Sequence, residues 1–365
     1  MPIERIEPIT LRIPWGPGDW GEFRNWTIVR VYTDDGRVGT GRGGDPHIIN
    51  TEFKDLLIGR DPASIAQHWQ RMFDKAWRFQ GPGANAMSSI CSIDIALWDL
   101  LGQAADLPVW RLLGGYSNTI PVYADGIGYE NEDVDRMAEK VAVHANLGFD
   151  HVKIHLTGPD PDENIEKVRR SRQALGPDKN LLVDVFRHWE GRTAALVVRK
   201  LLDYDLFLVE EPVRMNDEIG YLRMVRDMMI GTGTECYLAA GESENTLAGV
   251  VRLIAQGGVQ VIQTNPGSVG GYTGLMRVAS VCNAYNALLA PHGSQIPEIN
   301  CHLGAAIPNL LMIPITPAIE PFQIWSRLYD PPFVVEGPTL ELTESPGIGL
   351  SINEDFVLEH QIDLQ

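Results

Sequence analysis

The sequence predicts an α/β protein built on a closed (β/α) barrel of parallel strands, with a mixed α+β segment before it and a short tail after it. After about Ile120, short apolar runs alternate with longer amphipathic segments for about 200 residues. There are eight such runs, the strand number of a TIM-type barrel. They are IPVYADG, FDHVKIH, NLLVDVF, YDLFLVEEP, CYLAAGE, GVQVIQTN, YNALLAPH and MIPITPAIE. An open, doubly wound sheet is the competing interpretation of this alternation.

The segments around the barrel carry their own signals. Residues 24–41 contain two strand-like runs around an Asp-Asp-Gly turn, which predicts a β-hairpin. Residues 61–113 have a helical period, clearest over 87–106, and the glycines of LLGG mark its end. In the tail, ESPGIGLSI is typical of turns and a strand. The expected division is 1–118 for the N-terminal α+β domain, 119–324 for the barrel and 325–365 for the tail.

Composition narrows the class of protein. The formal net charge of −18 argues against nucleic acid and against anionic membrane surfaces as partners. The four cysteines lie far apart, without a CxxC pair, and predict reduced core residues of an intracellular protein. The N-terminus MPIERIEPIT is charged where a signal peptide needs an apolar run, and no apolar stretch reaches the roughly 18 residues of a membrane helix. We therefore expect a soluble, cytoplasmic protein.

Three acidic residues end consecutive apolar runs: Asp184 the third, Glu210 the fourth and Glu242 the fifth. In a parallel barrel these strand ends converge at one mouth. Carboxylates a few ångströms apart repel one another strongly unless a cation lies between them. Oxygen-only ligands suit a hard ion, so the three residues predict a Mg²⁺ site. Taken singly, each of them could instead be a helix cap or a turn residue.

Other polar residues end the remaining runs. Lys153 and His155 end the second run, Asn265 the sixth, His292 the seventh and Glu320 the eighth. Alternation along a strand places Lys153 and His155 on the same face, and the apolar residues around them indicate that this face is buried. Burying two basic groups side by side is costly, which favours a functional role for the pair.

Together these motifs resemble the enolase superfamily and, within it, the mandelate racemase-like subgroup that contains many acid-sugar dehydratases. The resemblance spans nearly the whole chain. It rests on SIDIALWDLLGQAADLPVWRLLGG for the capping-domain helix, VDVF, VEEP and AGE for the metal-ligand strand ends, KIH for the lysine-x-lysine type motif, APHGS for the seventh-strand histidine and PGIGL for the returning segment.

The resemblance implies a modified (β/α)8 barrel of the (β/α)7β type under an α+β capping domain, which the N-terminal region and the C-terminal tail form together. It further implies one essential Mg²⁺ per subunit and a reaction that begins by removing a proton next to a carboxylate. It also implies a small-molecule carboxylate substrate and a homo-oligomer, either a dimer or an octamer.

The sequence departs from the family pattern at two positions. The second residue of the usual lysine pair, normally a base, is His155, and the aspartate that usually partners the seventh-strand histidine is Asn265. In addition, no lysine follows Lys200. The muconate-lactonising-like subgroup, enolase and methylaspartate ammonia-lyase each need a lysine on a late strand, so all three are disfavoured.

These residues suggest separate roles. A positioned base contributes roughly 10²–10⁴ in rate, so most of the stabilisation must come from fixed cations and hydrogen bonds. We expect Lys153 and Mg²⁺ to stabilise the enediolate, with a further contact from Glu320. His155 is a candidate base that Lys153 and Mg²⁺ would keep neutral; alternatively, it only hydrogen-bonds the substrate. Asn265 can orient His292 but cannot offset its positive charge, which makes His292 a weaker base and a readier proton donor.

The combination favours a Mg²⁺-dependent dehydratase of a sugar acid, an aldonate or aldarate, that removes the α-proton, eliminates the β-hydroxyl and gives a 2-keto-3-deoxy acid. A racemase or epimerase of a 2-hydroxy acid is the runner-up, since it needs two competent bases. A glycosidase-type barrel and a non-catalytic binding protein are the alternatives from other classes. Substrate contacts are expected from Trp20 and Arg24 in the loop WGPGDWGEFRNW, and from Arg187 and His188 after the third strand.

Overall fold

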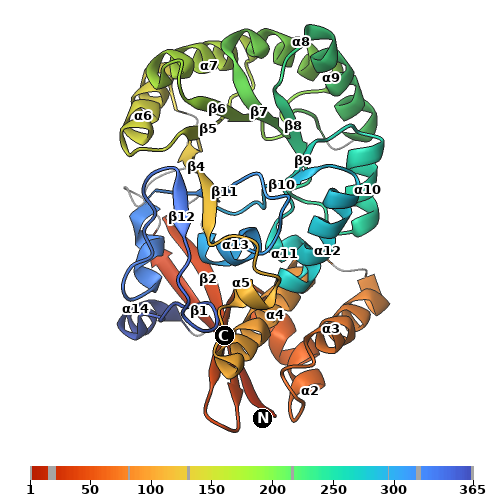
Figure 1. Cartoon of the computed structure of the whole chain (residues 1–365), viewed down its shortest axis with the longest axis vertical. Helices are drawn as coiled ribbons and strands as arrows, with labels where there is room; N and C mark the ends of the chain where they lie inside the picture. Colours follow the sequence, from red (N-terminus) through yellow and green to blue (C-terminus); the bar gives the residue numbers. More distant parts are fainter. Residues whose placement is uncertain are drawn as a thin grey trace.

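The computed structural model describes residues 2–14, 22–80, 83–129, 132–214, 218–294, 296–317 and 322–362. It shows a ring of strands and helices above a smaller domain, in which both ends of the chain lie (Figure 1). We call the upper part the barrel and the lower part the capping domain.

Eight parallel strands form the barrel; seven fall within a predicted apolar run, and β4 exceeds its run by one residue at each end. They are β4 (Thr119–Ile127), β5 (His151–His155), β6 (Asn180–Asp184), β7 (Leu206–Glu210), β8 (Tyr237–Ala240), β9 (Val261–Ile262), β10 (Leu288–Leu289) and β11 (Ile313–Ile315). Neighbours in the sheet follow chain order from β4 to β10, and β11 returns to pair with β4. A parallel bridge between Leu289 and Leu310 joins β10 to the segment before β11. This sequential order is that of a barrel and not of a doubly wound sheet.

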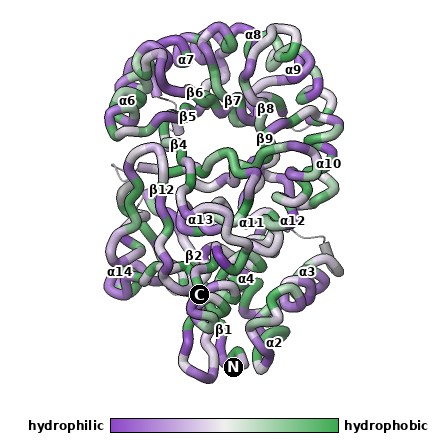
Figure 2. The backbone as a smooth tube through the Cα atoms, viewed as in Figure 1, coloured by the Kyte–Doolittle hydropathy of each residue, from purple (hydrophilic) through white to green (hydrophobic). Residues whose placement is uncertain are grey.

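Helices occupy the seven connections between consecutive barrel strands and cover the outside of the ring. They are α6 (Val134–Asn146), α7 (Pro161–Leu175), α8 (Gly191–Leu201) with the 3-10 turn η2 (Leu202–Tyr204), α9 (Glu218–Thr232), α10 (Leu247–Ala255), the pair α11 (Pro266–Val269) and α12 (Gly271–Ala284), and α13 (Pro297–Gly304). Figure 2 shows mainly hydrophobic residues along the inner strands and mainly hydrophilic residues along outer helices such as α7. The predicted (β/α)7β architecture is confirmed.

Inside the ring, one layer of side chains includes a charged residue. The apolar members come from the other seven strands or the residues next to them: Tyr123, Leu182, Leu208, Ala239, Val261, Ala290 and Met312. On β5 the residue paired in register with Leu182 is Lys153. Its ammonium group lies 5.3 Å from the centre of the Tyr123 ring. The apolar layer thus closes the barrel below the site and holds the stem of Lys153.

The capping domain is built on an antiparallel sheet in the order β13-β1-β2-β3. Its first three strands are β1 (Ile3–Pro14), β2 (Phe23–Thr33) and β3 (Val38–Arg42), and the predicted hairpin is the β2–β3 pair. The helical segments that follow are α1 (Pro46–Ile48), η1 (Ile49–Phe53), α2 (Lys54–Leu57), α3 (Ile65–Gln80), α4 (Ala84–Ala105) and α5 (Val109–Leu112).

Helix α4 lies between the two hydrophobic cores. Its Ile90 and Leu97 belong to the core of the capping domain, whereas Cys91 and Ile95 belong to the core of the barrel. A helix that is apolar on both sides must be buried on both sides, which explains the long apolar run of the sequence. All four cysteines are free and buried, as the sequence predicted.

The C-terminal tail returns to the capping domain, as the resemblance implied. It contains η4 (Phe322–Leu328), β12 (Thr339–Glu341), α14 (Glu354–His360) and β13 (Gln361–Ile362), which pairs with β1. Part of it also joins the barrel sheet, since β12 pairs with the start of β4. Asp99 of α4 holds the PGIGL segment by accepting a 2.9 Å hydrogen bond from the backbone N–H of Ile348.

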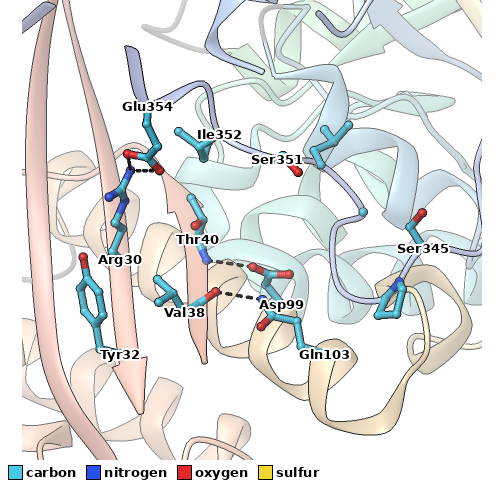
Figure 3. A pocket seen from close by; sticks show the side chains of 13 residues that line it. Arg30, Tyr32, Val38, Thr40, Asp99, Gln103, Ser345, Ser351, Ile352 and Glu354 are labelled. Carbon is cyan, nitrogen blue, oxygen red and sulfur yellow. Dashed lines mark hydrogen bonds and ion pairs between the residues drawn. The ribbon is translucent and has the colours of Figure 1, made fainter. Parts of the chain in front are cut away.

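A polar cleft of about 500 Å³ lies where the tail meets β2, β3 and α4 (Figure 3). Its charged groups are paired with other groups of the chain. Arg30 binds both carboxylate oxygens of Glu354, at 2.7 and 2.8 Å, and the carboxylate of Asp99 also accepts the Thr40 N–H. We therefore interpret the cleft as part of the packing interface between the C-terminal tail and the N-terminal part of the capping domain.

No helix in the described part of the chain combines the length and the apolar character needed to cross a bilayer.

Candidate active site

Lys153 lies at the centre of a buried cluster of carboxylates at the barrel mouth. Its Nζ lies 2.8 Å from Glu210, 3.9 Å from Asp125 and 4.0 Å from Asp184. The side chain is only 1% exposed. Burial by itself lowers the pKa of Lys153, but the surrounding carboxylates outweigh it and raise the pKa well above its usual range. Lys153 is therefore a permanent positive charge in the site.

The imidazole of His155 lies between two carboxylates. Its Nε2 is 2.6 Å from Asp125, and its Nδ1 is 3.1 Å from Asp184. The ring of Tyr129 stacks on it, with centroids 4.1 Å apart. Burial lowers the pKa of His155, but Asp125 and Asp184 more than offset this and raise the pKa to about 9. Without metal, Asp125 thus favours the charged form of His155; the prediction that Lys153 and Mg²⁺ together keep the ring neutral stays a prediction.

Asp125, at the end of the first barrel strand, is a site residue that the sequence analysis missed. It is almost fully buried, and in addition to His155 it accepts a 3.2 Å hydrogen bond from the Tyr129 hydroxyl. Burial raises its pKa, yet the charges of Lys153 and His155 dominate and hold the pKa of Asp125 far below the usual range. The signal was present, because the run IPVYADG places an aspartate near the end of its strand as the next runs do.

The three predicted metal ligands lie at the barrel mouth, but the carboxylate of Asp184 points in a different direction from those of Glu210 and Glu242. An oxygen of Glu210, an oxygen of Glu242 and a ring nitrogen of His292 all lie within 4.8 Å of one another. Asp184 is beside Glu210 in the sheet register, but its carboxylate faces Lys153 and His155. The pKa of Glu210 is raised to about 8, first by burial and then by the charge of Asp184.

The donor set fits a hard divalent cation. Oε2 of Glu210 accepts hydrogen bonds from Lys153 and Gln263, at 2.8 and 2.9 Å. Its Oε1 is buried and has no hydrogen-bond partner among the described residues. A buried carboxylate oxygen without a donor is costly, and a cation held also by Glu242 and Asp184 would satisfy it. Glu210 and Glu242 thus have the position and chemistry of cation ligands, whereas Asp184 as the third ligand stays a prediction.

Asn265 determines how His292 carries its proton. The Oδ1 of Asn265 accepts a 2.7 Å hydrogen bond from the Gly267 N–H at the start of α11, so its Nδ2 is the atom that faces His292, at 3.1 Å. An amide N–H can only donate, hence Nδ1 of His292 is the acceptor and Nε2 carries the hydrogen. Nε2 lies 3.5 Å from Glu242. Burial lowers the pKa of His292, whereas the weakening of this base by Asn265 stays a prediction.

The residues predicted to contact the substrate are found in different parts of the protein. Trp20 and Glu320 lie outside the described residues. Arg24 is on β2 of the capping domain, and the backbone carbonyl of His188 accepts a hydrogen bond from Arg214. Arg187 forms a two-bond ion pair with Glu211, at 2.7 and 2.9 Å. Its guanidinium is thus engaged inside the protein, which the sequence did not indicate.

A (β/α)7β barrel under an α+β cap, with a lysine and a set of carboxylates on consecutive strand ends, defines an enzyme of the enolase type. The family models support this assignment. Residues 22–114 match the mandelate racemase/muconate lactonizing enzyme N-terminal domain, and residues 136–356 match the enolase C-terminal domain-like model. The chain therefore belongs to the mandelate racemase/muconate lactonizing enzyme family of the enolase superfamily.

Characterised proteins of several names resemble this chain. It is 30% identical to a 3,6-anhydro-alpha-L-galactonate cycloisomerase of Streptomyces coelicolor, over 96% of this chain and 97% of that protein. It is 28% identical to a D-xylonate dehydratase of Haloferax volcanii, over 93% of this chain and 86% of that protein. Among solved structures, a racemase from Streptomyces coelicolor with bound magnesium has a TM-score of 0.86 and 26% identity, covering 99% of this chain and all of that chain.

Proposed function

We propose that this enzyme is a Mg²⁺-dependent dehydratase of a sugar acid, an aldonate or aldarate. The observation that carries the proposal is the asymmetry of the two histidines. His155 is held by Asp125, which makes it the stronger base, whereas Asn265 offers no negative charge to His292, which makes that ring the weaker base and, once protonated, the readier proton donor. One acceptor and one donor is what elimination of water requires.

The residues that would hold Mg²⁺ are Asp184, Glu210 and Glu242. When bound, the ion would take part of the negative charge that develops on the substrate carboxylate and would offset the charge of Asp184 beside His155. Lys153, which lies 2.8 Å from Glu210, would supply a second positive charge to the substrate carboxylate. These charges lie in a buried site, where electrostatic stabilisation is stronger than in water.

The proton movements follow from the two imidazoles. His155, held through Nε2 by Asp125, accepts the α-proton at Nδ1, and the C–H electron pair passes into the carboxylate to give an enediolate. The enediolate collapses and breaks the bond from the β-carbon to its hydroxyl. His292, once protonated at both ring nitrogens, gives the Nε2 proton to the departing hydroxyl, which leaves as water, and the ring returns to its neutral form. The enol that remains tautomerises to a 2-keto-3-deoxy acid.

The names of the relatives support this class of reaction without settling the substrate. The D-xylonate dehydratase of Haloferax volcanii carries the name of an elimination from a sugar acid. The bound magnesium in the Streptomyces coelicolor racemase structure supports the choice of metal. Homo-oligomer formation and a cytoplasmic location, both expected from the sequence, remain predictions.

A second candidate function is the opening of an anhydro-sugar acid. The relative named 3,6-anhydro-alpha-L-galactonate cycloisomerase matches 96% of this chain. The chemistry would be the same up to the enediolate, but the β-oxygen that leaves would belong to an ether ring. His292 would then protonate an alkoxide of the same molecule, so that no water is lost.

The test is a screen of mono- and diacid sugars and of a 3,6-anhydro sugar acid with Mg²⁺, in which 2-keto acids are detected with semicarbazide. We expect one or a few aldonates or aldarates to give a 2-keto-3-deoxy acid, and EDTA to abolish the product. Exchange or inversion of the α-carbon without keto acid would favour the racemase instead. Activity that survives EDTA would contradict the proposal and favour a glycosidase-type mechanism.

A further inference from the structure

Three residues at the ends of β6 and β7 adopt the left-handed backbone region without being glycine. Phe186 has φ 51°, Arg187 has φ 58° and Glu211 has φ 45°. Glu211 directly follows β7, which ends at Glu210, and Phe186 and Arg187 lie two and three residues beyond β6, which ends at Asp184. Such backbone conformations are unfavourable for residues with a Cβ and persist only where the surrounding contacts require them.

The carboxylate of Glu211 makes the contacts that explain this conformation. It is buried and accepts two hydrogen bonds from Arg187, Nε to Oε2 at 2.9 Å and Nη2 to Oε1 at 2.7 Å. Oε1 also accepts the backbone N–H of Gly241 at 2.9 Å and that of Glu242 at 3.2 Å. One carboxylate thus joins an arginine after β6 to the backbone after β8.

Arg187 extends the same connection. Its backbone N–H donates to the carbonyl of Glu211 at 2.9 Å, and its Nη1 donates to Oγ of Ser243 at 3.1 Å. The pair therefore ties together the ends of β6, β7 and β8. These are the three strand ends that carry the predicted metal ligands.

Glu242 is the ligand that most needs such support. It lies two residues beyond the end of β8, after Gly241 with φ 107°, and its side chain is 34% exposed. Asp184 and Glu210, by contrast, are the last residues of their strands and are buried. The carbonyl of Glu242 accepts long hydrogen bonds from the Asn265 N–H at 3.5 Å and the Ser268 hydroxyl at 3.3 Å, and Glu211 holds the N–H on the other side of the same residue.

The pairing also has an electrostatic consequence. A fourth carboxylate beside Asp184, Glu210 and Glu242 would compete for the cation or add to the repulsion among the ligands. The guanidinium of Arg187 neutralises Glu211 through a two-bond contact, the strongest geometry for this pair of groups. Glu211 can therefore organise the site without itself acting as a ligand.

We infer that Arg187 and Glu211 form a positioning unit that fixes Glu242 for Mg²⁺, and that Arg187 is not a substrate contact. The inference rests on the metal site of the proposed function, but it concerns metal affinity and not turnover. Positioning partners of metal ligands commonly affect affinity by about 10- to 100-fold.

The experiment measures Mg²⁺ binding to metal-stripped, full-length protein by isothermal titration calorimetry, without substrate. Glu211→Gln keeps the size of the side chain but removes its charge, and we expect the Kd for Mg²⁺ to rise at least about 10-fold. Arg187→Lys keeps the positive charge but loses the planar guanidinium that binds both oxygens of Glu211. This variant should also raise the Kd for Mg²⁺. Glu354→Gln, which removes the charge from the distant Arg30–Glu354 pair, should leave it unchanged.

Thermal melts check that each variant is folded before titration. If Glu211→Gln does not fold, Arg187→Lys alone tests the inference. Wild-type affinity in both variants would overturn the inference, as would a wild-type protein that takes up no Mg²⁺. So would an Arg187→Lys variant in which only the KM for substrate rises. If the wild type and variants bind Mg²⁺ as expected but no sugar acid is dehydrated, the proposed function fails and the positioning role stands.

Discussion

Asn265 donates its side-chain N–H to Nδ1 of His292 across 3.1 Å, and its oxygen cannot take that place because it caps α11. An aspartate in the same position would accept a hydrogen bond from Nδ1 and leave Nε2 free as a base. A single atom therefore determines which nitrogen of the neutral His292 ring carries the hydrogen and how strong a base that ring is.

The first prediction concerns the side-chain nitrogen of Asn265 that faces His292. In Asn265→Asp, neutral His292 should hold its hydrogen on Nδ1, and the new carboxylate should raise the pKa of His292, so that the protonated ring becomes a weaker acid towards the leaving hydroxyl. We expect dehydration to fall by about 10²-fold, the lower end of the usual contribution of a general acid. Exchange of the α-proton in deuterated water should continue or increase, as followed by ¹H NMR. Unchanged dehydration would show that the amide does not set the role of His292.

Asp125→Asn gives the second prediction. The substitution removes the carboxylate that faces Nε2 of His155, so the imidazole loses its orientation and much of its basicity. Both α-proton exchange and dehydration should fall by about 10²-fold, because both need the acceptor. Tyr129→Phe is the matched control, since it removes a hydrogen bond to Asp125 but leaves the Asp125–His155 contact in place. Equal losses in the two variants would contradict the assignment.

The third prediction is a loss of stability with rising pH in the metal-free protein. The pKa of His155 is raised from 6.5 to about 9, so its contribution is complete below pH 6.5 and is lost as the pH rises through 9. Folding also raises the pKa of Glu210 from 4.5 to about 8, so ionising it costs stability over that interval. Both groups act in the same direction.

Urea unfolding in EDTA should therefore show a lower free energy of unfolding at pH 9 than at pH 6.5. Added Mg²⁺ should stabilise the protein more at the higher pH, because its ligands are then deprotonated. His155→Asn should show a weaker pH dependence in EDTA. A metal-free protein that is more stable at pH 9 would contradict the charge pattern of the site.

Lys153→Met is the basis of the fourth prediction. Lys153 is buried among Asp125, Asp184 and Glu210, so its removal takes the positive charge from beside Glu210 and increases the repulsion among the three carboxylates. Breaking a buried ion pair by removing one partner typically costs about 3–5 kcal/mol. We expect a loss of this size in EDTA, measured by urea unfolding, and a smaller loss with Mg²⁺. The variant should also lack α-proton exchange even when saturated with Mg²⁺.

The control for this prediction is Lys167→Met. Lys167 is buried as deeply as Lys153, but it lies on the outer helix α7 and pairs with Glu163. Its loss should affect stability without the Mg²⁺ dependence and should leave α-proton exchange measurable. A stability loss in Lys153→Met that is unaffected by Mg²⁺ would argue against a shared electrostatic site.

The sequence by itself determined the order of the elements and the residues at the strand ends. Alternating apolar and amphipathic segments are a local property, and each of the eight predicted strands was found where its run lies. Lys153, His155 and the three acidic residues were identified because strand ends in a parallel barrel must converge.

Only the tertiary structure decided which of these groups touch. Asp125 and His155 are 30 residues apart, and their 2.6 Å contact depends on the pairing of β4 with β5. Arg187 and Glu211 likewise meet only because β6 and β7 end side by side with strained backbones. Such contacts determine pKa values, tautomers and ligand positions. They depend on distances of a few tenths of an ångström, which no local pattern in a sequence encodes.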